Sequence, residues 1–468
     1  MGVSKDWQTG QGGIRNIRQE AFMAQRLGII ADDLTGAADT GIQFAKRGFY
    51  TILLPFGLEN IESSSYLHEA QVVALNTSTR GMQAELAYDT VRNATGLLMQ
   101  TLRPQSIYKK VDSTLRGNVG AEIEAVMDAT GNQPALLAPA FPDYNRTTLQ
   151  GIHLVNGQPL SQTEVAFDPV NPVDESHVPA LIRAQTELKV GHIYLEEVRH
   201  GSEALQRSIS RHVKDGEKII GLDAATDDDL SNIAEAGMSM SSPPLMVGSA
   251  GLAYQLSRLL KRREHADRLS RSGRVAISTI QKSEGVIIII SGSLSAVTSR
   301  QLDEIRRTGR GKIMPVETHG FTGDREVSSK QESEIVSEII SAIKVSEVIG
   351  IQSVKRDRCD EQDTGARHDV PFVAERLGRI VLQIVRDCPK PIRGLIIAGG
   401  DTALAVFKHL GISQVRLMDE ILPGIPYGQV LDGEFAGLAV ITKAGAFGGE
   451  SALVDCVNFL MVGAAPTD

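Results

Sequence analysis

Charged and hydroxyl side chains follow the predicted strands in the first half of the sequence. Asp32 and Asp33 come after the apolar run at 27–31, and Arg80 follows the run at 72–75. The run at 107–109 is followed by a mixed cluster that contains Lys110, Asp112, Ser113 and Arg116. In open α/β sheets ligands collect at the carboxyl ends of the strands. Lysine and arginine suit a carboxylate or a phosphate, and Arg80 can clamp a carboxylate with two N–H groups. These turns therefore predict a site for a small anion that carries hydroxyl groups.

Each of these turns also has a plainer interpretation. A kinase or a hydrolase would use Asp32 or Asp33 as a base or a magnesium ligand, but a carboxylate in the first turn of a helix is also a good cap. The cluster around Lys110 can likewise be a capped turn with surface lysines. Neither turn decides between the two interpretations alone.

Turns of small residues follow three predicted strands in the second half. Gly399, Gly400, Asp401 and Thr402 join the apolar run at 395–398 to a helical pattern that ends before Gly411. The glycines allow a sharp turn and close approach of a ligand, Asp401 or Thr402 can cap the helix, and the free amides suit a phosphate. Similar small-residue turns contain Ser291, Ser293 and Gly445. Because neither GxxxxGK[ST] nor GxGxxG after a strand occurs, the prediction of a nucleotide site depends on the clustering of these turns.

The elements that position these turns alternate along the chain. Short apolar runs rich in β-branched residues alternate with helical patterns, for example the helix expected at 84–102 after the strand at 72–75. This alternation is typical of a parallel sheet flanked by helices. Asn156-Gly157 between apolar residues predicts a β-hairpin that interrupts it. We therefore expect an α/β fold with two domains, each with a mainly parallel sheet flanked by helices.

Length and composition set the domain organisation. With 468 residues, 42% of them hydrophobic, the chain exceeds one typical core. We expect a flexible leader at 1–26, one α/β domain at 27–262, a linker at 263–284 and a second α/β domain at 285–468. The linker is charged and serine-rich, and its arginines are read as a solvated surface rather than an anion site.

Charge and cysteine usage exclude several classes of protein. The formal net charge of -9 disfavours a general binder of nucleic acid or anionic membrane, so a small molecule is the expected partner. No apolar run reaches the roughly 18 residues of a membrane-spanning helix. Cys359, Cys388 and Cys456 are far apart and form no CxxC pair, which predicts neither a disulfide framework nor a structural zinc site and fits the cytoplasm.

Five segments together resemble the four-carbon acid sugar kinase family, which includes D-threonate, D-erythronate and 3-oxo-tetronate kinases. These segments are 30–37, 110–117, 138–142, 291–293 and 399–402. The resemblance implies that 27–262 binds the acid sugar, that 285–468 binds ATP, and that the active site lies in the cleft between the domains. It also implies transfer of a phosphoryl group to the terminal C4 hydroxyl.

The resemblance also assigns residues. Asp32, Arg80 and the segment 110–113 would face the acid, with Asp33 and Arg116 beside them, and Ser291 or Ser293, the turn 399–402 and Gly445 would face ATP. Asp32 or Asp112 would orient the hydroxyl as a base, and Arg80 and Lys110 would hold the carboxylate. Mg²⁺ would bridge the phosphates through ligands that the sequence does not identify.

Two other functions stay open at this stage. An NAD-dependent sugar-acid dehydrogenase would need a dinucleotide fingerprint, which is missing. A non-catalytic sensor of a sugar acid or nucleotide would bind without turnover. A homodimer is also left open, because many enzymes form symmetric dimers.

Overall fold

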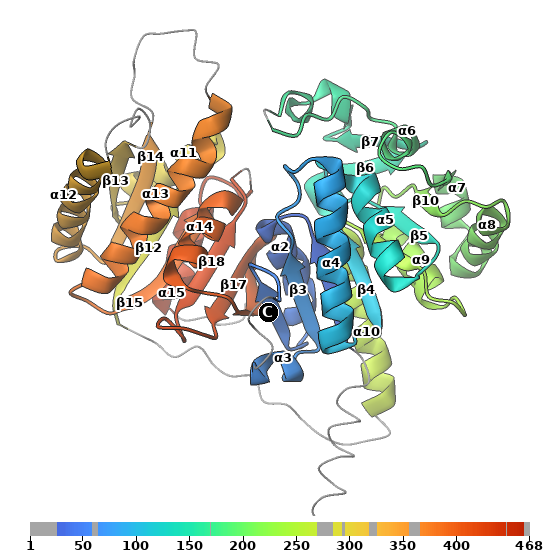
Figure 1. The fold of residues 1–468 in the computed structure, drawn as a ribbon, viewed down its shortest axis with the longest axis horizontal. Coiled ribbons are helices and arrows are strands. Elements are labelled where there is room, and N and C mark those ends of the chain that lie inside the picture. Colours follow the sequence, from blue (N-terminus) through green and yellow to red (C-terminus); the bar gives the residue numbers. More distant parts are fainter. Residues whose placement is uncertain are drawn as a thin grey trace, which may run out of the picture.

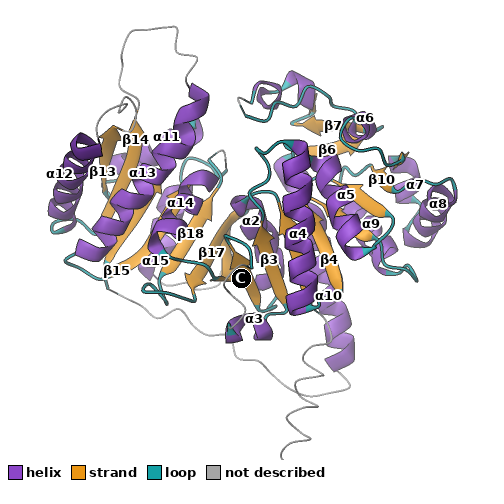
Figure 2. Cartoon of the chain, in the orientation of Figure 1, coloured by secondary structure: helices purple, strands orange, loops and turns teal. Residues whose placement is uncertain are grey.

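The structure is a computed structural model that describes residues 26–58, 64–168, 170–268, 284–292, 295–317, 325–354, 366–445 and 447–462. Strands and helices alternate along the described chain, and the helices pack beside one extended sheet (Figure 1). Figure 2 shows the strands side by side through both halves of the molecule. The predicted α/β class with a mainly parallel sheet flanked by helices is confirmed.

The first half contributes parallel strands with helices between them. Its strands are β1 (Leu27–Ala31), β2 (Thr51–Leu54), β3 (Val72–Asn76), β4 (Ser106–Lys110), β5 (Ala135–Ala138), β9 (Val190–Ile193), β10 (Ile219–Leu222) and β11 (Leu245–Gly248). Its helices are α2 (Leu34–Ala45), α3 (Ser65–Glu69), α4 (Ala84–Leu102), α5 (Val119–Thr130), α6 (Val178–Arg183), α7 (Leu195–Arg199), α8 (Ser202–Lys214), α9 (Asp227–Met238) and α10 (Ala250–Arg268). In the register of the sheet, Ala31 at the end of β1 pairs with Asn76 of β3 and Lys110 of β4. The three strands therefore end level, and the turns that follow them meet at one edge.

The second half repeats the alternation. Its strands are β12 (Val286–Ser291), β13 (Lys312–Glu317), β14 (Val348–Val354), β15 (Ile392–Ala398), β16 (Val415–Leu422), β17 (Ile425–Val430) and β18 (Ala439–Lys443). Its helices are α11 (Ala296–Arg307), α12 (Arg325–Ile343), α13 (Ala366–Asp387), α14 (Gly400–Leu410) and α15 (Ala452–Val462). Every residue of β12 is buried, as expected for a strand covered on both faces.

An antiparallel pair of strands joins the two halves. β16 pairs with β17 and with β2 of the first half, and β17 pairs with β18. The two parallel parts thus form one 15-stranded sheet in the order β13-β14-β12-β15-β18-β17-β16-β2-β3-β1-β4-β11-β5-β10-β9. The sequence predicted a sheet in each domain but not this joint, because pairing between strands far apart in the sequence leaves no local pattern.

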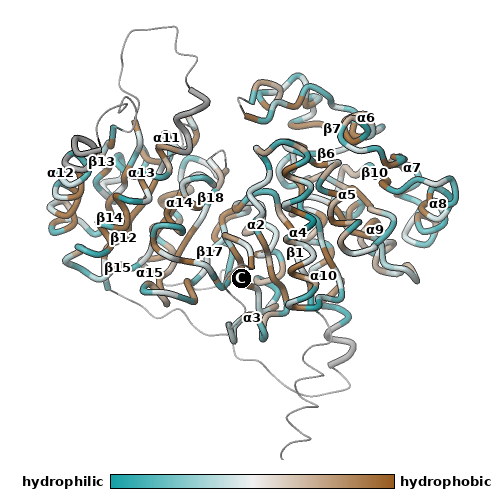
Figure 3. The backbone as a smooth tube through the Cα atoms, viewed as in Figure 1, coloured by the Kyte–Doolittle hydropathy of each residue, from teal (hydrophilic) through white to brown (hydrophobic). Residues whose placement is uncertain are grey.

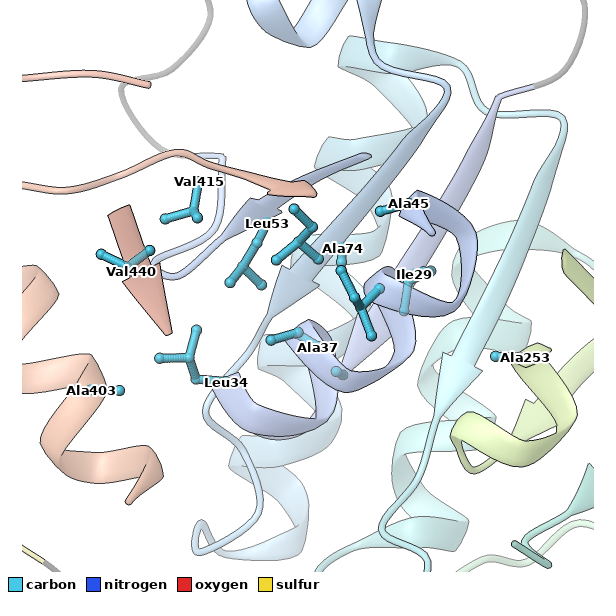
Figure 4. Packing of buried hydrophobic residues seen from close by; sticks show 14 of the residues in the cluster. Ile29, Leu34, Ala37, Ala45, Leu53, Ala74, Ala253, Ala403, Val415 and Val440 are labelled. Atoms are coloured by element: carbon cyan, nitrogen blue, oxygen red, sulfur yellow. The ribbon is translucent and has the colours of Figure 1, made fainter. Parts of the chain in front are cut away.

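The hydrophobic core continues across the joint. Figure 4 shows Leu34 and Ala37 of α2 close to Val440 of β18 and Ala403 of α14, and all four belong to one cluster of buried side chains. Side chains alternate along β1, so Ile29 packs in that cluster and Ile30 packs in the cluster on the opposite face. In Figure 3 the strands are mostly hydrophobic and the outer helices mix both classes of residue. Shared burial fixes the two halves against each other.

A small antiparallel sheet interrupts the first half. It contains β6 (Arg146–Leu149), β7 (Ile152–Val155) and β8 (Gln158–Pro159), and confirms the hairpin predicted from Asn156-Gly157. Short 3-10 helices flank it at Pro142–Tyr144, Leu160–Gln162 and Glu164–Phe167. Thr148 of β6 bonds through its backbone to Ala224, N to O at 2.8 Å and O to N at 3.1 Å. The hairpin is therefore attached to the turn after β10.

Several expected boundaries need correction or fall outside the described residues. α10 continues to Arg268, into the segment expected as a linker, while 269–283 and residues 1–25 of the expected leader lie outside the described residues. Arg26 is buried, and its guanidinium donates to the carbonyls of His68, Ala70 and Leu102.

Candidate active site

Asp32, Asp33 and Arg80 meet after the level ends of β1 and β3. The Nε atom of Arg80 lies 2.7 Å from Oδ2 of Asp32, and its Nη2 atom lies 3.1 Å from Oδ1 of Asp32 and 2.7 Å from Oδ1 of Asp33. Burial raises the pKa of Asp32, but Arg80 and the neighbouring lysines outweigh burial and hold it below its ordinary value. Asp32 is therefore an ionised, buried carboxylate held by two N–H groups.

Asp112 and Arg116 form a second ion pair after β4. Nε and Nη2 of Arg116 lie 2.7 and 3.2 Å from the two oxygens of Asp112, and the hydroxyl of Thr114 donates to Asp112 at 2.5 Å. Arg80 approaches Asp112 as well, at 3.8 Å. Burial raises the pKa of Asp112, but Arg116 and Arg80 outweigh it and hold the pKa well below the ordinary range. Both carboxylates expected as a base are therefore ionised and weakly basic.

Lys110 and Ser113 lie beside these ion pairs. Both side chains are largely buried, and Nζ of Lys110 donates to the carbonyl of Val111 at 2.9 Å, which leaves two of its three protons for other acceptors. The neighbouring Lys109 points the other way, into a fully buried ion pair with Glu122 at 2.7 Å. This pair fixes the end of β4, and with it the direction of Lys110.

His153 of the hairpin holds the backbone of Ser113. Its Nε2 atom donates to the carbonyl of Ser113 at 2.9 Å, and its Nδ1 atom pairs with the hydroxyl of Thr148 at 2.9 Å. Burial lowers the pKa of His153 to about 4, so the ring is neutral at physiological pH. The hairpin is therefore fastened to the same turn that carries Asp112 and Ser113.

The turn from β15 to α14 differs from its expected capping. Gly399 is the N-cap, with φ at 108°, a left-handed conformation that favours glycine, and no side chain accepts a cap hydrogen bond there. Asp401 and Thr402 lie inside α14, so the expectation that one of them caps the helix is wrong. Among the described residues no side chain therefore accepts from the first-turn amides, and the N-terminus of α14 keeps its affinity for an anion.

Gly400 brings the two halves into contact. A Cβ atom on Gly400 would lie 3.5 Å from Cγ2 of Thr35 and 4.0 Å from Oδ2 of Asp33. Asp33 caps α2 by accepting from the amide of Gly36 at 2.9 Å. Burial raises the pKa of Asp401, and Asp33 raises it further. The N-termini of α2 and α14 thus face each other, with one carboxylate from each half.

Two further turns adjoin Gly399. Ser291 ends β12 beside Ala398 of β15, and its buried hydroxyl has no hydrogen-bond partner among the described residues. The carbonyl of Lys443 accepts from the amide of Gly399 at 2.9 Å, and the carbonyl of Gly445 accepts from the hydroxyl of Thr298 at 2.8 Å. Ser291, the turn 399–402 and Gly445 therefore gather at one edge, while Ser293 lies outside the described residues.

Several residues near the site were not among those predicted from the sequence. Asp39 of α2 is buried, and its Oδ1 atom has no hydrogen-bond partner in the part of the chain that the structure describes. Tyr144 stacks on Phe447 with ring centroids 4.8 Å apart. Arg146 lies near both rings. No pattern in the sequence signalled this group, because the aromatic partners come from opposite halves of the chain.

Comparisons with known proteins agree with the two halves. A model of a sugar-binding N-terminal domain matches residues 27–256, and a model of a nucleotide-binding C-terminal domain matches residues 288–453. A solved structure from Salmonella typhimurium LT2 shares the fold with a TM-score of 0.75 at 24% identity, over 92% of this chain and 98% of that chain.

Curated relatives extend over nearly the whole chain. The D-threonate kinase of Salmonella typhimurium is 34% identical over 92% of this chain and 97% of its own length. The D-erythronate kinase of Heliobacterium modesticaldum is 28% identical over 92% and 96%, and the 3-oxo-tetronate kinase of Pseudomonas fluorescens is 28% identical over 90% and 94%. With both domain models matched in order, the chain belongs to the four-carbon acid sugar kinase family.

Proposed function

We propose that this protein is an ATP-dependent kinase that phosphorylates the terminal C4 hydroxyl of a four-carbon sugar acid. The observation that carries the proposal is the approach of Gly400 to Asp33 and Thr35, which brings an uncapped helix N-terminus of the nucleotide half next to the carboxylates of the sugar half. Phosphoryl transfer needs such positioning and charge neutralisation more than covalent chemistry. We accordingly propose that the reaction takes place between the two domains.

The proposed division of labour follows the two halves. Asp32, Arg80, Lys110, Asp112, Ser113 and Arg116 bind the acid, with Asp33 at the boundary, and Ser291, Ser293, the turn 399–402 and Gly445 bind ATP. Lys110 is the best placed of the expected cations for the carboxylate, because Arg80 already donates to Asp32 and Asp33. Asp32 and Asp112 are the candidates that orient the hydroxyl. Their low basicity suits a loose transition state that requires little proton removal from the hydroxyl.

Mg²⁺ is the proposed metal. The described part of the chain contains no group of three or more His, Cys, Asp or Glu side chains that could hold a metal ion. Magnesium bound to nucleotides, however, usually takes only one or two carboxylates together with phosphate oxygens. Asp33 and Asp401 fit that requirement, because one carboxylate comes from each half and the charge of Asp33 raises the pKa of Asp401. When bound there, the ion neutralises phosphate charge.

Names of relatives guide the choice of acid. D-threonate is the first acid to test, because a D-threonate kinase is 34% identical, followed by D-erythronate and 3-oxo-tetronate. A homodimer and the cytoplasm stay predictions from the sequence. Within the described residues, every helix is too short or too polar to cross a membrane.

A coupled assay tests the proposal against both alternatives. The purified chain is mixed with ATP, Mg²⁺ and each acid, and ADP release is measured. Acid-dependent release of ADP supports the kinase. Reduction of NAD⁺ by the acid would support the dehydrogenase, and binding of the acid without turnover would support the sensor.

A further inference from the structure

Arg146 is a partly buried arginine at the boundary between the two halves. Its Nε and Nη1 atoms are buried and have no hydrogen-bond partner within the described residues. Burial lowers the pKa of Arg146, Asp112 and Asp39 raise it and Arg116 lowers it, yet no carboxylate of a described residue lies within ion-pair distance of its guanidinium. Buried N–H groups without acceptors are unfavourable, so their presence here needs a reason.

The other arginines of the site are already occupied. Arg80 donates to Asp32 and Asp33, and Arg116 donates to Asp112 and Asp168. Each of these guanidiniums is therefore held by carboxylates of the protein itself. Arg146 is thus the guanidinium near Asp112 with buried N–H groups left for an incoming anion.

Packing against aromatic rings does not satisfy these N–H groups. The guanidinium carbon of Arg146 lies 5.6 Å from the ring centre of Tyr144 and 5.7 Å from that of Phe447. Both distances are close to the outer limit of about 6 Å for a cation–π contact. The rings hold the guanidinium in place from both halves, since Tyr144 follows β5 and Phe447 follows β18.

The hairpin gives Arg146 a fixed position. Arg146 begins β6, and two residues later Thr148 bonds through its hydroxyl to His153, which in turn donates to the carbonyl of Ser113. The same hydrogen bonds that attach the hairpin to the turn after β4 therefore set the distance between Arg146 and that turn. Such fixed donors are typical of sites that bind charged groups.

We propose that Arg146 binds an anionic group of one of the two substrates. This group is either the carboxylate of the sugar acid or the phosphoryl group that is transferred from ATP. The inference rests on the proposed kinase function. A planar guanidinium with two free N–H groups suits either anion, because both present paired oxygens. Neither the spacing of the motifs nor the resemblance assigned this residue a role.

The test compares Arg146→Met and Arg146→Lys with the wild type, with Arg47→Met as the matched control. Arg47 also stacks on a ring, with its guanidinium carbon 4.2 Å from the centre of Tyr254, but lies outside the site. Arg146→Met should lower kcat/KM for the acid roughly 100-fold, as loss of one fixed oxyanion donor does. Arg146→Lys should recover little of this, because an ammonium lacks the paired geometry. The control should stay within about threefold of the wild type.

Binding measurements distinguish the two anions. Calorimetric titrations use D-threonate and a non-hydrolysable ATP analogue separately. A weaker affinity for threonate with unchanged affinity for the analogue identifies the carboxylate as the anion. Unchanged affinities with a lower kcat identify the phosphoryl group.

Other outcomes would overturn the role of Arg146. These are activity and affinities of Arg146→Met within threefold of the wild type, or a loss equal to that of Arg47→Met. A loss accompanied by a fall in thermal midpoint that Arg146→Lys fully reverses would also overturn it, because it would assign the residue to packing. An inactive wild type would refute the kinase function separately, while the titrations, which need no turnover, would still decide on Arg146.

Discussion

Replacing Asp39 by asparagine should change how the stability of the protein depends on pH. Asp39 is buried on α2, and its Oδ1 atom has no hydrogen-bond partner among the described residues. Burial raises the pKa of this carboxyl from 3.8 to about 7. Lys110 and Lys46 face it and lower the pKa, whereas Glu420 and Asp33 raise it, and burial outweighs their sum.

The sign follows from which state binds the proton. Above pH 3.8 the unfolded chain releases the proton of Asp39, while the folded protein keeps it until about pH 7. Stability therefore falls as the pH rises through this window and levels off above it. One pKa unit corresponds to about 1.4 kcal/mol, so the penalty above the window is roughly 4 kcal/mol, of which about 3 kcal/mol develops between pH 5 and pH 8.

Urea unfolding of wild type and Asp39→Asn at pH 5 and pH 8 measures this penalty. The amide resembles the protonated carboxyl, so the variant should gain about 3 kcal/mol relative to the wild type between the two values. Thr40→Val, a buried neighbour without a titratable group, should show the same difference from wild type at both values. A difference between Asp39→Asn and wild type that does not change with pH would refute the reasoning.

Three further substitutions test separate parts of the account. Lys110→Ala should raise the KM for the acid at least about tenfold by removing a charge-assisted contact, with the KM for ATP nearly unchanged in initial-rate assays, and equal loss of both would contradict the division of labour. Gly400→Val should raise the KM for ATP, because its side chain would occupy the space in front of the first-turn amides, where a Cβ atom alone already contacts Thr35 at 3.5 Å, and an unchanged nucleotide affinity would count against the phosphate site. Glu122→Gln leaves the charge of Lys109 buried and unpaired, so urea unfolding should show a loss of about 3–5 kcal/mol, and a loss below about 1 kcal/mol would mean that the pair contributes little.

Local patterns in the sequence predicted the strands and the turns that follow them. The apolar run of β1 is buried on both faces, and the level register of β1, β3 and β4 brings Asp32, Arg80 and Lys110 to one edge as expected. The sequence could not show which charges pair. Arg80, which was expected to hold the substrate's carboxylate, also pairs with Asp32 and Asp33, and this pairing is set by distances within the fold.

Features that depend on distant segments could not be predicted. The antiparallel strand β16 joins the halves by pairing with β2, which lies far from it in the sequence. Arg146 gains its position from a hairpin and from the ring of Phe447 in the other half. The capping of α14 was misjudged because the φ of Gly399 moves the cap ahead of Asp401 and Thr402.

The most direct test of the kinase function follows the phosphorus of ATP by NMR. The purified chain is incubated with ATP, Mg²⁺ and D-threonate, D-erythronate or 3-oxo-tetronate in turn. The account predicts that with at least one acid a phosphomonoester resonance appears at the rate of ADP formation and couples to the protons on C4. Release of inorganic phosphate without a phosphorylated acid, or no reaction with any of the three acids, would contradict it.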